Sequence, residues 1–131
     1  MLIGDFQKML DHVSIAVKNF EKSKAFYTAI LAPLGVTPET EFPGAVGFGK
    51  KGSGGPDFWI GEGPQVSKGG HIAFQAPSRE AVRQFHALGL KAGGQDEGAP
   101  GPRPIYHEHY YAAFLWDPDG FKVEAVIHTP E

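Results

Sequence analysis

The sequence contains no cysteine, and this absence excludes several kinds of site at once. Disulfides, thiolate nucleophiles and zinc–thiolate centres all need cysteine sulfur. A metal site in this chain would therefore have to use nitrogen and oxygen ligands. Six histidines are present that can supply the nitrogen atoms.

Long apolar runs and clusters of basic residues are missing as well. No stretch approaches the roughly 18 consecutive apolar residues of a membrane-spanning helix. The net charge is −3 and the lysines and arginines are scattered, so neither a membrane nor a nucleic-acid partner is expected. Met1 is not followed by the pattern of a signal peptide. We therefore expect a soluble cytoplasmic protein.

What is present indicates one globular domain, residues 1–131. Hydrophobic residues make up 41% of the chain and charged residues 21%, which is the composition of a protein with a real core. The length suits a single domain. The chain also holds 18 glycines and 11 prolines, and this abundance predicts many turns between short elements.

The chain contains an internal repeat. The segment Asp-His-Val-Ser-Ile-Ala-Val, which includes His12, aligns with Gly-His-Ile-Ala-Phe-Gln-Ala, which includes His71. The same offset pairs Glu21 with Glu80, Phe26 with Phe85, Leu31 with Leu90 and Gly35 with Gly94. Self-similarity at a fixed spacing is the mark of a repeated structural unit. We therefore predict two modules within the domain, approximately residues 9–65 and 69–128.

Each module has the same predicted order of elements, a strand, a helix and then short strands. The first strands are expected at 9–17 and 70–76, and the helices at 19–31 and 78–90, where Asn19 and Ser78 are good N-caps. Further strands are expected near 45–49, 57–60, 110–116 and 121–128. The pattern is βαβββ, twice, an α+β fold. The proline-rich segment 93–109 is expected to be a long loop, because prolines do not fit inside a sheet.

Strand alternation groups three residues that can hold a metal ion. His12 and His71 lie on the small, polar faces of their strands, while their branched and aromatic neighbours point the other way. Glu124 interrupts an apolar run, and a carboxylate there is costly to bury unless it is paired or bound to metal. Two histidines and one carboxylate suit a single divalent ion of Fe, Mn, Ni, Co or Zn.

Paired βαβββ modules that carry His12, His71 and Glu124 resemble the vicinal oxygen chelate superfamily, which includes glyoxalase I, extradiol dioxygenases and bleomycin resistance proteins. The matching stretches are Leu10–Tyr27, Gly70–Phe74 and Asp117–Glu124. The resemblance implies a glyoxalase-like half-barrel fold in which two modules enclose a metal-centred cavity. It also implies that the metal binds two neighbouring oxygens of a substrate.

The sequence departs from this family's pattern at two positions. Enzymes like glyoxalase I use a fourth ligand, a glutamate on the last strand of the first module, and the repeat places Trp59 there. True glyoxalase I activity is therefore not expected. Extradiol enzymes tend to carry a tyrosine six residues before the glycine of the final turn, where this chain has Phe114. This difference weighs against ring cleavage.

Other candidate site residues come from the second module and from apolar positions of the first. A neutral histidine is a natural proton carrier near neutral pH. We predict catalytic roles for His107 and Tyr111, and substrate contacts from Trp59, Phe48, Arg103 and Tyr110. Because Tyr110 and Tyr111 are adjacent, only one of them can face the site. His86 and His128 are expected at the surface without a role.

The leading hypothesis is a metal-dependent enzyme of glyoxalase or dioxygenase type that acts on a small oxygen-rich substrate. Isomerase or lyase chemistry is preferred over oxygenation. The alternatives are an extradiol-type dioxygenase and a metal-free protein that sequesters a small molecule, and the intact ligand set favours the enzyme. A homodimer is expected, and the modules could pair within one chain or across two. Across two chains, His12 would share a metal with the partner's His71 and the partner's Glu124.

Overall fold

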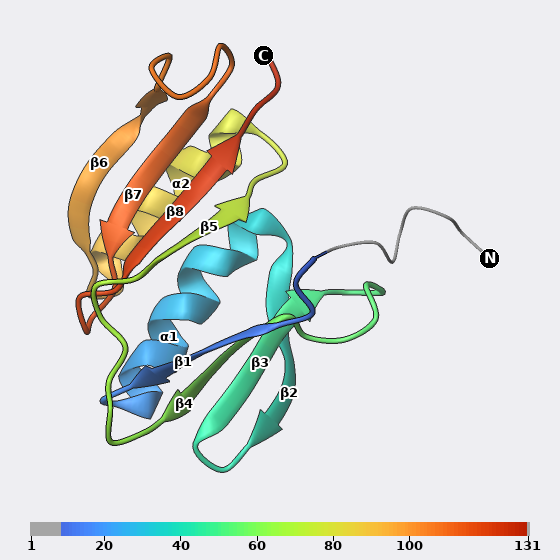
Figure 1. Ribbon diagram of the computed structural model, residues 1–131, viewed down its shortest axis with the longest axis vertical. Helices are drawn as coiled ribbons and strands as arrows, with labels where there is room; N and C mark the ends of the chain where they lie inside the picture. The colour runs from blue at the N-terminus through green and yellow to red at the C-terminus, as the bar shows by residue number, and fades with distance from the viewer. Residues whose placement is uncertain (1–8, 131) are drawn as a thin grey trace.

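The computed structural model describes residues 9–130, and within them two modules follow one another with the same order of strands and long helix (Figure 1). The first contains β1 (Val13–Val17), α1 (Phe20–Leu31), a short 3-10 helix (Ala32–Leu34), β2 (Val36–Phe42), β3 (Ala45–Lys50) and β4 (Phe58–Glu62). The second contains β5 (His71–Gln75), α2 (Arg79–Lys91), β6 (Gln95–Pro102), β7 (Tyr111–Trp116) and β8 (Lys122–Ile127). The predicted βαβββ order is confirmed.

Each module builds one four-stranded sheet, and the two sheets share a topology. Their strand orders are β1-β4-β3-β2 and β5-β8-β7-β6. In both sheets the first strand runs parallel to the last, and the other neighbours are antiparallel. The repeat in the sequence is therefore a repeat in space, and the predicted α+β fold of two modules is confirmed.

The two long helices begin where the sequence places their caps. The Asn19 side chain accepts a hydrogen bond from the backbone N–H of Lys22 at 3.1 Å, and the Ser78 hydroxyl accepts one from Ala81 at 3.0 Å. These bonds satisfy N–H groups that a helix leaves unpaired at its start. The helices pack against each other between the two sheets (Figure 1). No helix within residues 9–130 is long and apolar enough to cross a membrane.

The segment 93–109 is not the long loop that its prolines and glycines predicted. Gln95–Pro102 forms β6, an edge strand paired with β7. An edge strand tolerates proline because one side of its backbone needs no partner. The pairing with β7 also shifts register on both sides of Gly98, and such irregularities let the proline-containing run join the sheet.

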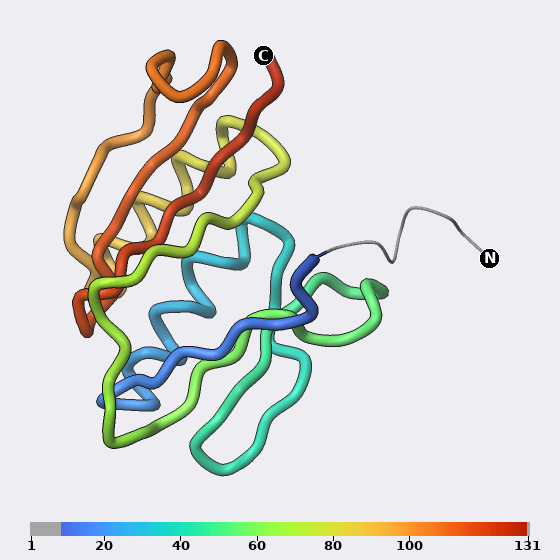
Figure 2. The backbone as a smooth tube through the Cα atoms, viewed as in Figure 1, coloured from blue at the N-terminus to red at the C-terminus, as the bar shows by residue number. Residues whose placement is uncertain are grey.

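One continuous core joins the modules. Its members come from the helix-facing sides of both sheets and from both helices, and the rings of Phe58 and Phe74 meet across the modules at 5.2 Å. The segment that links β4 to β5, whose path Figure 2 shows, is also hydrogen-bonded to the first module. Within it, the N–H of Ser67 donates to the carbonyl of Ala16 at 2.8 Å, and the N–H of Ala16 donates to the Ser67 hydroxyl at 2.9 Å. These bonds cover part of the edge strand β1.

A buried hydrogen bond fixes the turn between β7 and β8 to the first module. The fully buried Tyr27 of α1 donates its hydroxyl to Asp117 Oδ2 at 2.6 Å. The other carboxylate oxygen of Asp117 accepts from the N–H groups of Asp119 and Phe121, both at 2.8 Å. Burial and the Asp117 carboxylate raise the pKa of Tyr27 well above its usual value. The turn that leads into β8, the strand of Glu124, is therefore fixed both by the Tyr27 hydroxyl of the first module and by backbone N–H groups of the turn itself.

Candidate functional site

The face of the second sheet that is turned away from α2, here called its open face, carries a cluster around Glu124. The Glu124 side chain is only 1% exposed. Its Oε1 lies 2.8 Å from Nε2 of His71, and its Oε2 accepts a hydrogen bond from the hydroxyl of Tyr110. Burial, and then the hydrogen bond with Glu124, raise the pKa of Tyr110, so this hydroxyl keeps its proton and remains a donor at neutral pH. The predicted proximity of His71 and Glu124 is confirmed.

Cationic and apolar groups surround this cluster. Phe114 lies directly opposite Glu124 in the β7–β8 pairing, and its ring centroid is 6.1 Å from that of His71. The Arg103 guanidinium lies 5.4 Å and the Lys122 ammonium 5.0 Å from the centre of the Phe114 ring. Arg103 also donates to the carbonyl oxygens of Ala99 and Gly101, which fixes its position. The open face therefore combines one buried carboxylate, one imidazole and two cations.

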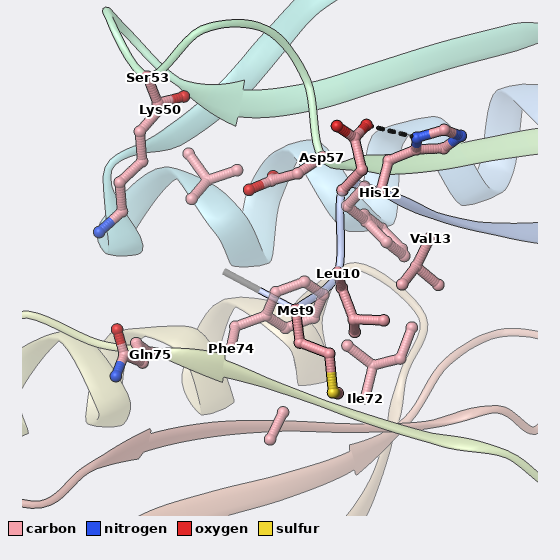
Figure 3. Close-up of a pocket in the computed structure, with 14 residues that line it drawn as sticks. Met9, Leu10, His12, Val13, Lys50, Ser53, Asp57, Ile72, Phe74 and Gln75 are labelled. Atoms are coloured by element: carbon pink, nitrogen blue, oxygen red, sulfur yellow. Dashed lines mark hydrogen bonds and ion pairs between the residues drawn. The ribbon is translucent and has the colours of Figure 1, made fainter. Parts of the chain in front are cut away.

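His12 lies elsewhere in the chain. Its side chain is 55% exposed, and its Nδ1 lies 2.8 Å from Asp11 Oδ1. It lines a groove of about 660 Å³ between the modules, to which Phe58, Ile72 and Phe74 also contribute (Figure 3). Within residues 9–130, no three histidine or acidic side chains converge to hold a metal. A single chain thus brings His71 and Glu124 together but not His12.

Trp59 occupies the position in the first sheet that Glu124 occupies in the second. In the parallel pairing of β1 with β4, Ser14 lies opposite Trp59, and in that of β5 with β8, Ala73 lies opposite Glu124. Ser14 and Ala73 are equivalent in the sequence repeat. The predicted equivalence is confirmed by this register, so the first module offers an indole where the second offers a carboxylate.

Two predicted site residues point into the core instead, and these predictions are corrected. Phe48 is fully buried against Tyr27 and Phe58, because alternation along β3 turns its neighbours Gly47 and Gly49 to the open face. Tyr111 faces α2, where its hydroxyl accepts a hydrogen bond from Arg83 at 3.2 Å. Tyr110, not Tyr111, is the tyrosine that meets Glu124.

The surroundings of His86 and His128 differ from the prediction that both lie at the surface without a role. His107 is exposed, and its ring meets that of His128 at 5.6 Å, while His128 meets the ring of Tyr110 at 4.9 Å. His128 therefore lies beside the Glu124 cluster, although the alternation of side chains along the strand gave no indication of this position. The expected surface position of His86 is wrong, since this residue is 8% exposed and its Nε2 lies 2.8 Å from Asp96.

The donor atoms of His71 and Glu124 fit a divalent metal ion. Nitrogen and oxygen ligands bind such ions at about 2.0–2.2 Å, so two ligands at right angles lie about 3 Å apart. The Nε2 of His71 and the Oε1 of Glu124 face each other at 2.8 Å. The hydrogen bond from Tyr110 supplies the outer partner that metal-binding carboxylates commonly have.

A comparison of the sequence with models of protein families identifies the family of this chain. The model of the Glyoxalase/Bleomycin resistance protein/Dioxygenase superfamily matches residues 9–125. The chain belongs to this superfamily. A comparison with curated protein sequences gave no match.

Solved structures of this superfamily share the fold. A glyoxalase/bleomycin resistance protein from Albidiferax ferrireducens is 33% identical, with a TM-score of 0.78 over 94% of this chain and 100% of that one. A putative glyoxalase from Bacillus halodurans is 26% identical, with a TM-score of 0.68 over 92% and 96%. A variant of the fosfomycin resistance protein FosX from Listeria monocytogenes, solved with Mn(II) and a dihydroxypropylphosphonic acid, is 23% identical, with a TM-score of 0.66 over 98% and 93%.

Proposed function

We propose that this superfamily member is a metal-dependent enzyme that acts on a small oxygen-rich substrate, with isomerase or lyase chemistry. One divalent ion of Fe, Mn, Ni, Co or Zn would be held by His71 and Glu124 of one chain together with His12 of a second copy. The observation that carries the proposal is the pair of donor atoms on the open face, Nε2 of His71 and Oε1 of Glu124, 2.8 Å apart.

Two features support a second copy as the source of the third ligand. His12 is exposed and lies apart from the cluster within its own chain, so its imidazole is accessible to another molecule. The repeat makes His12 the counterpart of His71, so two modules that face each other would bring equivalent strands together. Module pairing across two chains would therefore complete the ligand set. Metal binding itself is supported by FosX, which has the same fold and was solved with Mn(II).

The chain's own residues would prepare the site for a negatively charged substrate. When bound, the metal would act as a Lewis acid toward two neighbouring substrate oxygens. Tyr110 orients the Glu124 carboxylate through its hydroxyl. Arg103 and Lys122 add positive charge beside Phe114, and Lys122 is also paired with Glu97 at 3.6 Å. Arg103 foremost would stabilise anionic oxygens of a substrate there. His107 stays a candidate proton carrier at the rim.

Metal analysis of untagged protein tests the proposal. We expect close to one divalent ion per chain after purification, or after titration of EDTA-treated protein, because each symmetric dimer would contain two equivalent sites. Plasma mass spectrometry and calorimetric titration measure this content. Less than about a tenth of an equivalent, with no uptake on titration, would contradict the proposal and favour the metal-free, ligand-sequestering alternative.

A further inference from the structure

The open face of the first sheet, the one turned away from α1, has a floor of very small side chains. A pocket of about 440 Å³ lies on it, and its floor is made by Ala16, Ala45 and Gly61. Ser14, Ser67 and Glu62 also line it, and among residues 9–130 no lysine, arginine or histidine does. Such a floor leaves room above the sheet for a flat group.

Trp59 forms the wall of this pocket and is braced from behind. Its ring lies nearly parallel to that of Phe42, with the centroids 6.0 Å apart and an angle of 8° between the planes. The indole also lies tightly over Gly47, where an added Cβ would come within 2.7 Å of Trp59 Cε2. Glycine at this position is what lets the indole lie across the sheet.

We propose that Trp59 and the small-residue floor form a subsite for the planar, uncharged aromatic part of the substrate. That this pocket serves the substrate rests on the proposed function, whereas binding of an aromatic ring in the pocket does not require the metal. Trp59 stands at the register position of Glu124, so the indole faces the same side of its sheet as the carboxylate does in the second. The substrate class is thus an aromatic compound with neighbouring oxygens.

The chemistry of the pocket selects an aromatic ring over other occupants. Aromatic pairs gain about 0.5–1.5 kcal/mol beyond the burial of their area, and the indole of Trp59 can supply one partner of such a pair. The acidic residue Glu62 in the lining, and the lack of a cation among the described residues that line the pocket, disfavour an anionic group at this end. In the proposed two-chain site, the anionic part of the substrate would instead face the partner's Arg103 and the partner's Lys122, which lie beside Phe114 in the second module.

Two matched diols test this subsite. Phenylethanediol and cyclohexylethanediol carry the same pair of hydroxyls, and the cyclohexyl ring is the more apolar, so burial alone would favour it. The chain has two tryptophans, and W116F leaves Trp59 as the sole tryptophan, whose emission is excited selectively at about 295 nm or above, where the four tyrosines absorb little. We expect saturable quenching of Trp59 by phenylethanediol at about a tenfold lower concentration than by cyclohexylethanediol. Equal affinities, or tighter binding of the cyclohexyl compound, would overturn the proposal.

Two variants test the subsite without relying on Trp59 fluorescence. By calorimetry, Trp59→Leu and Gly47→Ala should each weaken phenylethanediol binding about tenfold, the second by displacing the indole. Trp116→Phe is the control and should bind like the wild type. Unchanged binding in Trp59→Leu would contradict the subsite.

The experiment separates this inference from the proposed function when it is run on full-length protein as purified and again in EDTA. Discrimination between the diols in both conditions supports the subsite, even if no metal binds. Loss of discrimination in a protein that binds its metal overturns the subsite and leaves the proposed function in place.

Discussion

Glu124→Ala is expected to weaken metal binding by at least about a hundredfold, since it would remove one of the three proposed ligands and the group that positions His71. His71→Ala should do the same. Calorimetric titration of EDTA-treated protein with Mn(II) and Zn(II) measures both losses. If Glu124→Ala and His71→Ala both bind metal like the wild type, the ion is not held by this cluster.

Tyr110→Phe is the matched control for these two variants. It leaves both ligands in place and removes only the hydroxyl that holds Oε2 of Glu124. Loss of such an outer partner typically costs 10–100-fold in metal affinity. We expect about a tenfold decrease with one ion per chain retained, which separates the role of orienting the carboxylate from that of binding the ion.

Asp117→Ala is expected to lower the free energy of unfolding by about 3 kcal/mol, because hydrogen bonds to a charged group contribute about 1.5–3 kcal/mol and several are lost together. The buried carboxylate accepts bonds from the Tyr27 hydroxyl and from two backbone N–H groups of its own turn. The Tyr27 hydroxyl would also lose its partner inside the core. Urea denaturation followed by circular dichroism measures the change, and a loss below about 0.5 kcal/mol would show that the turn does not depend on this network.

Tyr27→Phe removes only one bond of the same network and serves as its partner experiment. We expect a loss of about 1 kcal/mol at neutral pH. The pKa of Tyr27 is raised in the folded protein, whereas in the unfolded chain it is about 10. The Tyr27 hydroxyl therefore contributes fully to the free energy of unfolding below about pH 10, and this contribution falls as the pH rises above that value. The stability difference between wild type and Tyr27→Phe should therefore shrink between about pH 10 and 11. A difference that stays constant over this range would contradict the raised pKa.

Much of the fold and part of the site could be predicted from sequence because they depend on local rules. The repeat fixes which residues are equivalent, and equivalent positions recur in the strand register, as Trp59 and Glu124 show. Alternation within a strand is sufficient to place His71 and Glu124 on one face. The N-caps at Asn19 and Ser78 follow from side-chain chemistry alone.

The errors came from features that local rules do not determine. The β6 strand depends on an edge position and on two register shifts, neither of which its prolines and glycines reveal. The choice between Tyr110 and Tyr111 depends on where β7 begins. The arrangement of the two modules is set by packing between helices, so sequence could group His12 with His71 but could not say that one chain holds them apart.

Mixing two variants that each lack one proposed ligand tests the shared metal centre most directly. His12→Ala and Glu124→Ala should each bind metal at least about a hundredfold more weakly than the wild type, so neither alone retains it at a concentration that saturates the wild type. In a mixed dimer, His12 of the Glu124→Ala chain would meet His71 and Glu124 of the His12→Ala chain, so one of two sites would be intact and about half an equivalent of metal per chain should bind. Metal bound fully by His12→Ala alone, or absent from the purified mixed dimer, would contradict a centre built from two chains.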